Sequence, residues 1–278
     1  LLIHEGAADD AEAHAAMVFG ADRTYFVLNG TSTSNKVVTG ALLKRGDLVL
    51  LEPLLGIGEL AISDHRSSQP TFDEILRLAA DAHVSGLMTG KAGVLHLHLG
   101  DGPRGLELVR RALDESEIPA RVFNPTHVNR RKALFDEAVT LAAKGCYIDL
   151  TAFPVEDGED AWSAAEGLQR YLASGAPADR ITISSDAGGC LPCFDAEGRV
   201  SSMNVGHSGA LLETLRTLVD GGMPLETALP AFTANPARLL RLARKGRVEA
   251  GADADLVVLD ATGAAQTVII GGHIHVRE

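Results

Sequence analysis

Apolar and polar positions alternate in a regular order from Glu52 onward. Short runs of apolar residues are followed by longer stretches in which apolar residues recur at helical spacing. This alternation is typical of a parallel β/α fold, and it predicts five strand and helix units. The predicted strands are 60–62, 94–99, 121–123, 147–150 and 181–183, and the helices that follow them are 71–83, 105–113, 132–143, 161–172 and 211–219.

The pattern changes after Leu240. Short apolar segments at 245–251, 256–260 and 268–270 are separated by glycines, which predicts a small β element. We therefore expect a (β/α) barrel domain over 52–242 and a C-terminal β element over 243–278.

The first 51 residues follow a third pattern. A helix is predicted over 11–19 and a strand over 25–28, before a loop rich in Gly, Ser and Thr that opens another helix. Such a loop can bind phosphate through its backbone N–H groups. Ser and Thr before a helix are, however, more often plain helix caps.

Composition narrows the choice of partners and compartment. The formal net charge of −12 over 278 residues disfavours binding to nucleic acid or to an anionic membrane. The sequence has neither a membrane-spanning apolar run nor a signal peptide at its start, so we expect a cytoplasmic protein. The three cysteines are too few for a disulfide framework, and Cys190 and Cys193 read as ordinary loop thiols.

Candidate metal ligands lie on three successive strand and helix units. They are Glu59, His98 and His127, and closing the sheet would bring them together at one rim of a barrel. Two imidazoles and one carboxylate suit a catalytic Zn²⁺. His96 competes with His98, because alternate residues of a strand share a face, but His98 is nearer the rim. Asp186 could serve as a proton acceptor beside the metal, or simply cap a turn.

Two arginines and their neighbours form a second group of candidates. Arg66 and Arg130 could bind a substrate carboxylate in bidentate fashion, or could balance acidic surroundings. Asp64 and His65 could orient a metal ligand, or could be simple loop residues.

Four segments together resemble the isoaspartyl (β-aspartyl) dipeptidases, metal-dependent members of the amidohydrolase superfamily. The resemblance covers about residues 55–278 and implies a TIM-type (β/α)8 barrel with a small β-sandwich. The segments that carry it are 56–68, 125–130, 184–190 and 251–260.

The resemblance also implies roles for individual residues. Glu59 would bridge two metals, and His98 and His127 would complete the ligands of one of them. Asp186 would act as last-strand metal ligand and proton shuttle. The implied substrate contacts are Arg66, Arg130 and Cys190.

The chain departs from that family upstream of Glu52. The first three barrel strands, a His-x-His motif, a catalytic tyrosine and half of the β-sandwich have no counterpart. Five units cannot close an eight-stranded barrel, so we expect a partial barrel. Its open sheet edge would be covered by the N-terminal segment, by another subunit, or, in a marginal fragment, by nothing. We expect a homo-oligomer.

Residues 1–51 resemble the ornithine, lysine and arginine decarboxylases that use pyridoxal phosphate. The resemblance lies in 4–6 and 26–36, where those enzymes bind the cofactor phosphate. The later strand and its Schiff-base lysine have no counterpart, so we do not expect the cofactor to bind.

The leading functional hypothesis is metal-dependent hydrolysis of isoaspartyl dipeptides with one or two Zn²⁺ ions, impaired by loss of the first strands. One alternative is a catalytically silent chimera or a scaffold that folds with a partner. A weaker one is a fragment that binds pyridoxal phosphate at residues 32–34.

Overall fold

The computed structural model describes residues 55–194, 200–260 and 262–276, with residues 190–194 and 200–204 described by their backbone alone. The chain divides into two units, Leu1–Pro53 and Leu54–Glu278. In the first unit the described residues are 10, 13, 14, 16 and 17, which are helical. The strand expected at 25–28 and the Ser and Thr loop lie outside the described residues.

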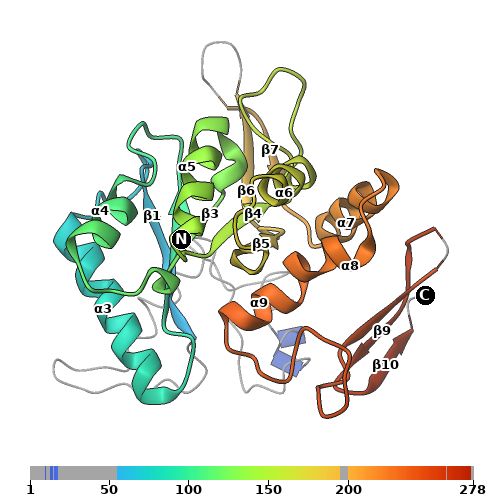
Figure 1. The fold of residues 1–278 in the computed structure, drawn as a ribbon. Helices are drawn as coiled ribbons and strands as arrows, with labels where there is room; N and C mark the ends of the chain where they lie inside the picture. The colour runs from blue at the N-terminus through green and yellow to red at the C-terminus, as the bar shows by residue number, and fades with distance from the viewer. Residues whose placement is uncertain are drawn as a thin grey trace. The chain divides into compact units, whose positions relative to one another are not determined.

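Parallel strands form the centre of the second unit (Figure 1). Three of them pair in the order β1-β2-β3, and the other two pair as β4-β5. Because the strands within each group are parallel, their carboxyl ends lie at the same edge of that group. The strands are β1 (Gly56–Ile62), β2 (Val94–Leu99), β3 (Phe123–Thr126), β4 (Ile148–Thr151) and β5 (Ile181–Ser184).

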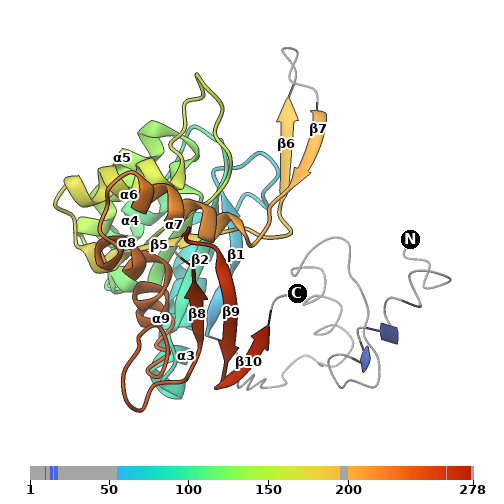
Figure 2. The same ribbon diagram turned by 90° about the vertical axis from the view of Figure 1, so that its right-hand side faces the viewer.

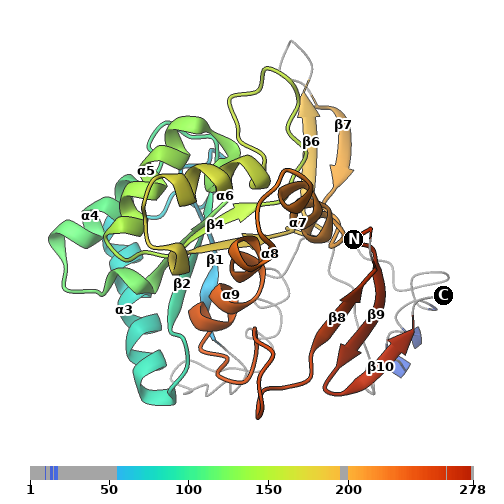
Figure 3. The ribbon, with the colours of Figure 1, turned by 45° about the vertical axis from the view of Figure 1, so that its right-hand side comes forward.

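Helices follow these strands and lie along one side of them (Figures 2 and 3). The helix after β1, α3 (Phe72–Thr89), begins at a capping box. In it the side chains of Thr71 and Glu74 each accept a hydrogen bond from the backbone N–H of the other residue. Short 3₁₀ helices join several elements: η1 (Ala120–Val122), η2 (Val128–Arg130), η3 (Ala178–Arg180) and η4 (Leu229–Phe232). The α-helices are α3 (Phe72–Thr89), α4 (Glu107–Glu115), α5 (Lys132–Ala143), α6 (Ala164–Ala173), α7 (Ala210–Asp220), α8 (Leu225–Ala228) and α9 (Ala234–Leu239).

The two faces of the parallel strands differ in polarity. Successive strand residues point to opposite faces, so each strand divides its residues between the two. One set packs with the helices in the hydrophobic core: Leu95, Leu97, Leu99, Phe123, Ile148, Leu150, Ile181 and Ile183. The alternate set is polar: His96, His98, Asn124, Thr126, Asp149, Thr151, Thr182 and Ser184.

Asp149 joins three strands across this polar face. Its buried carboxylate accepts hydrogen bonds from the hydroxyls of Thr126 (2.7 Å), Thr182 (2.5 Å) and Ser184 (2.5 Å). Thr126 ends β3, whereas Thr182 and Ser184 belong to β5. The carboxylate therefore links β3 to the β4-β5 pair.

Antiparallel elements complete the second unit. The hairpin of β6 (Cys190–Phe194) and β7 (Val200–Val205) projects away from the helices in Figure 2. The C-terminal sheet has the order β10-β9-β8, formed by β8 (Leu256–Leu259), β9 (Ala265–Ile270) and β10 (His273–Val276). No helix among the residues described is long and apolar enough to cross a membrane.

Two strand predictions were wrong. Residues 245–251 form turns, where Arg244 and Lys245 pair with Asp253 across the loop at 2.7 and 3.2 Å. The strand expected at 121–123 begins only at Phe123, because η1 occupies the preceding residues. The β6-β7 hairpin was not predicted.

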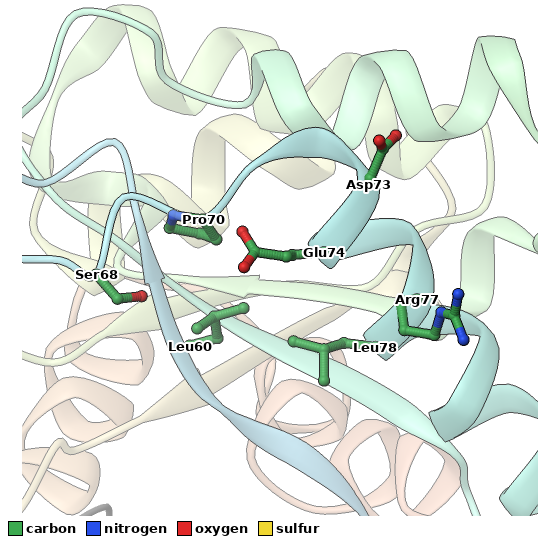
Figure 4. Close-up of a pocket in the computed structure, with 7 residues that line it drawn as sticks. All are labelled: Leu60, Ser68, Pro70, Asp73, Glu74, Arg77 and Leu78. Atoms are coloured by element: carbon green, nitrogen blue, oxygen red, sulfur yellow. The ribbon is translucent and has the colours of Figure 1, made fainter.

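A shallow cavity of about 520 Å³ lies between β1 and the start of α3 (Figure 4). Leu60 and Leu78 line it together with the polar side chains of Glu74 and Arg77. Leu60 follows Glu59 on β1, so the two side chains point to opposite faces of the strand. The cavity is therefore separate from the candidate metal ligands.

Candidate metal centre

Three side chains from neighbouring strands converge: Glu59 within β1, His98 near the end of β2 and His127 just after β3. Glu59 Oε1 lies 3.1 Å from His98 Nδ1 and 3.3 Å from His127 Nε2. The two imidazole rings meet edge to face, with centroids 4.5 Å apart. One ligand atom from each residue lies within 4.8 Å of the others, which makes this a group able to hold a metal ion.

Local backbone geometry places Glu59 in this cluster. The pairing of β1 with β2 is irregular between Ile57 and Leu60. Gly58 has a φ of 151°, and a Cβ there would lie 2.7 Å from the Cβ of His96. Only glycine fits this close approach without a shift of the strands.

His127 is held from two sides. It follows β3 in the left-handed conformation, with φ 62°, and is buried. Its Nδ1 lies 2.6 Å from Thr151 Oγ1 on β4. A proton on Nδ1, donated to this hydroxyl, leaves the Nε2 lone pair directed at Glu59.

Glu59 carries a negative charge in this setting. Burial acts to raise its pKa, but hydrogen bonds and charge interactions with His127 and His98 together outweigh burial and hold the pKa well below its ordinary value. The cluster thus presents one anionic oxygen between two imidazoles.

This donor set fits a zinc ion. Oxygen and nitrogen ligands bind Zn²⁺ at about 2.0–2.1 Å, so tetrahedral ligands lie about 3.3 Å apart. The separations of Glu59 Oε1 from the two imidazole nitrogens, 3.1 and 3.3 Å, are close to this value. Three protein ligands would leave a fourth position open, as in catalytic zinc sites.

Asp64 lies near the His98 ring nitrogen that does not face Glu59. Its Oδ2 lies 3.5 Å from His98 Nε2, and its carboxylate is bound by Arg66 Nε (3.0 Å) and Nη2 (2.8 Å). The Asp64 side chain is 2% exposed. His65, by contrast, is exposed, and its Nδ1 lies 3.8 Å from Asp64 and 3.7 Å from Asp101.

Arg130 brings a positive charge close to the ends of β2 and β3. Its Nη1 donates to the carbonyl of Leu99, 2.7 Å away, at the end of β2. Burial lowers its pKa, and neighbouring Arg66 adds to the effect, although a guanidinium stays protonated in proteins. Among the described side chains no carboxylate lies within ion-pair distance of Arg130. The remaining N–H donors could bind an anion.

The other predicted site residues are placed less directly. Asp186 follows β5 in a left-handed conformation, with φ 46°. Among the described residues, the group around His127 that is able to hold a metal ion consists of Glu59, His98 and His127 and does not include Asp186. Its roles as ligand and proton shuttle remain predictions. The Cys190 side chain lies outside the described residues.

Two residues of the site were not predicted from the sequence. Thr151 fixes a candidate ligand ring, and the hydrogen bonds of Asp149 join the strands that carry the site. Polar residues at alternate positions of the apolar runs 148–151 and 181–184 were the available signal.

Comparison with known proteins shows the class. The model of the family described as "Amidohydrolase family" matches residues 57–275, and the chain belongs to this family. A crystal structure of β-aspartyl dipeptidase from the thermophilic, keratin-degrading Fervidobacterium islandicum AW-1, in complex with a β-Asp-Leu dipeptide, matches with 38% identity and a TM-score of 0.75. The match covers 82% of this chain and 58% of that one. The predicted family resemblance is thereby confirmed.

A curated relative is also similar over this part of the chain. A deacetylase of Agrobacterium fabrum is 26% identical over 205 residues, which cover 68% of this chain and 48% of the deacetylase. The chain therefore spans little more than half of the dipeptidase and about half of the deacetylase.

The N-terminal resemblance is confirmed as well. Residues 1–53 match the family described as "Orn/Lys/Arg decarboxylase, major domain". The constitutive ornithine decarboxylase of Escherichia coli K12 is 73% identical over 52 residues, which are 19% of this chain and 7% of that enzyme. The similarity thus concerns a small part of a decarboxylase.

Proposed function

We propose that this amidohydrolase is a metal-dependent hydrolase of β-aspartyl dipeptides. The observation that carries the proposal is the cluster of Glu59, His98 and His127 beside the guanidinium of Arg130, which has no ion-pair partner among the described side chains. A metal site beside an anion site suits the hydrolysis of a small substrate that carries a carboxylate. The similarity to a β-aspartyl dipeptidase supports the choice of substrate.

Different residues of the chain would bind the metal, bind the substrate and transfer the proton. Glu59, His98 and His127 would hold the metal, and a bound Zn²⁺ would supply Lewis-acid polarisation and activation of water. Arg130 would bind a substrate carboxylate and orient the dipeptide. The Asp186 carboxylate would accept a proton during attack on the amide and return it to the leaving amine.

Assembly belongs to the same proposal. We take the five parallel strands to be the later part of a (β/α)8 barrel and the chain to act as a homo-oligomer. A second subunit would then cover the exposed edge of the sheet.

Metal binding and turnover test the proposal separately. The full chain, stripped by a chelator and reconstituted with Zn²⁺, is expected to bind one equivalent and to hydrolyse β-Asp-Leu but not α-Asp-Leu. His127→Ala should abolish both properties. His83→Ala is the matched control, because His83 lies on α3 beside Arg121.

Two results would overturn the proposal in different ways. Absence of bound zinc after reconstitution would remove the metal centre. Zinc binding without chelator-sensitive turnover would favour the catalytically silent alternative, in which the cluster survives and the chemistry does not.

A further inference from the structure

Asp64 contacts both a candidate metal ligand and a candidate substrate-binding arginine. Its Oδ2 lies 3.5 Å from His98 Nε2 and 2.8 Å from Arg66 Nη2. Its Oδ1 accepts from Arg66 Nε and from the backbone N–H of the same residue. The carboxylate therefore joins two residues from different strand and loop segments.

The geometry points to Asp64 as a positioning residue that holds the His98 ring with its Nδ1 directed at the metal. This inference rests on the proposed function and deepens it. It assigns to Arg66 the role of fixing the Asp64 carboxylate, in addition to any contact with substrate.

The two nitrogens of His98 have different neighbours. Nδ1 faces Glu59 at 3.1 Å, inside the metal group, whereas Nε2 faces Asp64. Only a nitrogen without a proton can bind a metal, so ligation through Nδ1 requires the proton to lie on Nε2. A carboxylate accepts a proton and cannot donate one when ionised, so Asp64 favours the required tautomer.

Hydrogen bonds from Arg66 fix the Asp64 carboxylate in place. Arg66 donates to Oδ1 from its backbone N–H (2.7 Å) and its Nε (3.0 Å), and to Oδ2 from Nη2 (2.8 Å). The side chain is 2% exposed, whereas Arg66 is 57% exposed. The buried carboxylate is thus fixed by a guanidinium that reaches in from the surface.

The distance between Asp64 and His98 is slightly longer than an ordinary N–H···O hydrogen bond. Catalytic hydrogen bonds are often long before ligands bind and shorten in the complex.

The substitution Asp64→Asn tests the inference. It keeps the size and shape of the side chain but removes the charge and offers an N–H donor to His98 Nε2. We expect zinc affinity, measured by competition with a chromophoric chelator, to fall about 10-fold to 100-fold. Asp101→Asn is the matched control, because Asp101 is a nearby exposed carboxylate. The zinc affinity of this variant should differ from that of the wild type by less than about 3-fold.

A second measurement needs no metal. In the ¹H–¹⁵N spectrum of histidine rings in the metal-free protein, the Nε2–H resonance of His98, assigned by its loss in His98→Gln, should be resolved in the wild type and in Asp101→Asn. It should disappear or shift strongly in Asp64→Asn. Thermal unfolding checks that the variants are folded, and Asp64→Glu, which restores the charge, should recover part of the affinity.

Unchanged zinc affinity and an unchanged His98 resonance in Asp64→Asn would overturn the inference. Failure of the wild type to cleave β-Asp-Leu would count against the proposed function instead. The two ideas can therefore fail independently.

Discussion

The hydroxyl of Thr151 lies 2.6 Å from Nδ1 of His127, in the buried space between β3 and β4. This contact fixes the ring that offers its other nitrogen to Glu59. Partners of this kind on the far nitrogen of a ligand orient the ring and raise its basicity. The hydroxyl thus supports the candidate metal centre without being one of its three ligands.

Thr151→Val should weaken zinc binding while leaving the fold intact. Valine has nearly the same shape, and the backbone of Thr151 keeps its hydrogen bonds to Asn129. Zinc affinity should fall about 10-fold. Thr140→Val on α5 is the control, since the Thr140 hydroxyl bonds only its own helix. Equal affinity in the two variants would contradict the role of Thr151.

Parts of this fold could be predicted because the local pattern matches the final environment. The strand predicted over 94–99 and the helix predicted over 132–143 are confirmed at both ends by β2 and α5. The prediction of a strand over 245–251 was wrong. The large apolar residue of this segment, Val248, is 84% exposed and contributes nothing to a buried face.

The site likewise contains residues that could be predicted from the sequence and residues that could not. Glu59, His98 and His127 could be found because each is a carboxylate or an imidazole within or next to an apolar run. Thr151 and Asp149 could not, because hydroxyl and carboxyl groups acquire their roles only when β3, β4 and β5 come together. Their partners lie 23 to 35 residues away in the sequence.

Asp149→Leu should destabilise the second unit by about 2–4 kcal/mol, because it removes the carboxylate that accepts from two buried hydroxyls and one half-buried hydroxyl. Asp149→Asn should cost less, since hydroxyls can donate or accept and can reorient around an amide. Urea unfolding measures both values. If the leucine variant is as stable as the wild type, the carboxylate does not hold these strands together.

Cys146 should be inert to thiol reagents in the folded protein. Burial raises the pKa of its thiol to about 12. At pH 8 about one thiol in 10,000 is ionised, and only the thiolate reacts. In a Cys190→Ser, Cys193→Ser background, labelling by a chromogenic disulfide should follow unfolding in urea. Rapid labelling without urea would show that the thiol is accessible in the native state.

Arg130→Lys should impair substrate binding more than the chemical step. Lysine keeps the positive charge but loses the planar fork that binds a carboxylate and the bond to Leu99 together. We expect KM for β-Asp-Leu to rise at least about 10-fold with a smaller change in kcat. Arg111→Lys is the control, because Arg111 pairs with Glu115 on the surface of α4.

Amidated dipeptides identify the group that Arg130 recognises. Replacing the bound carboxylate by an amide should raise KM in the wild type, because the charged hydrogen bonds to the guanidinium are lost. The same replacement should have little further effect in Arg130→Lys, since the two changes remove one interaction. If the effects of substitution and amidation are additive for both carboxylates of the dipeptide, Arg130 binds neither of them. The anion site would then serve another part of the reaction.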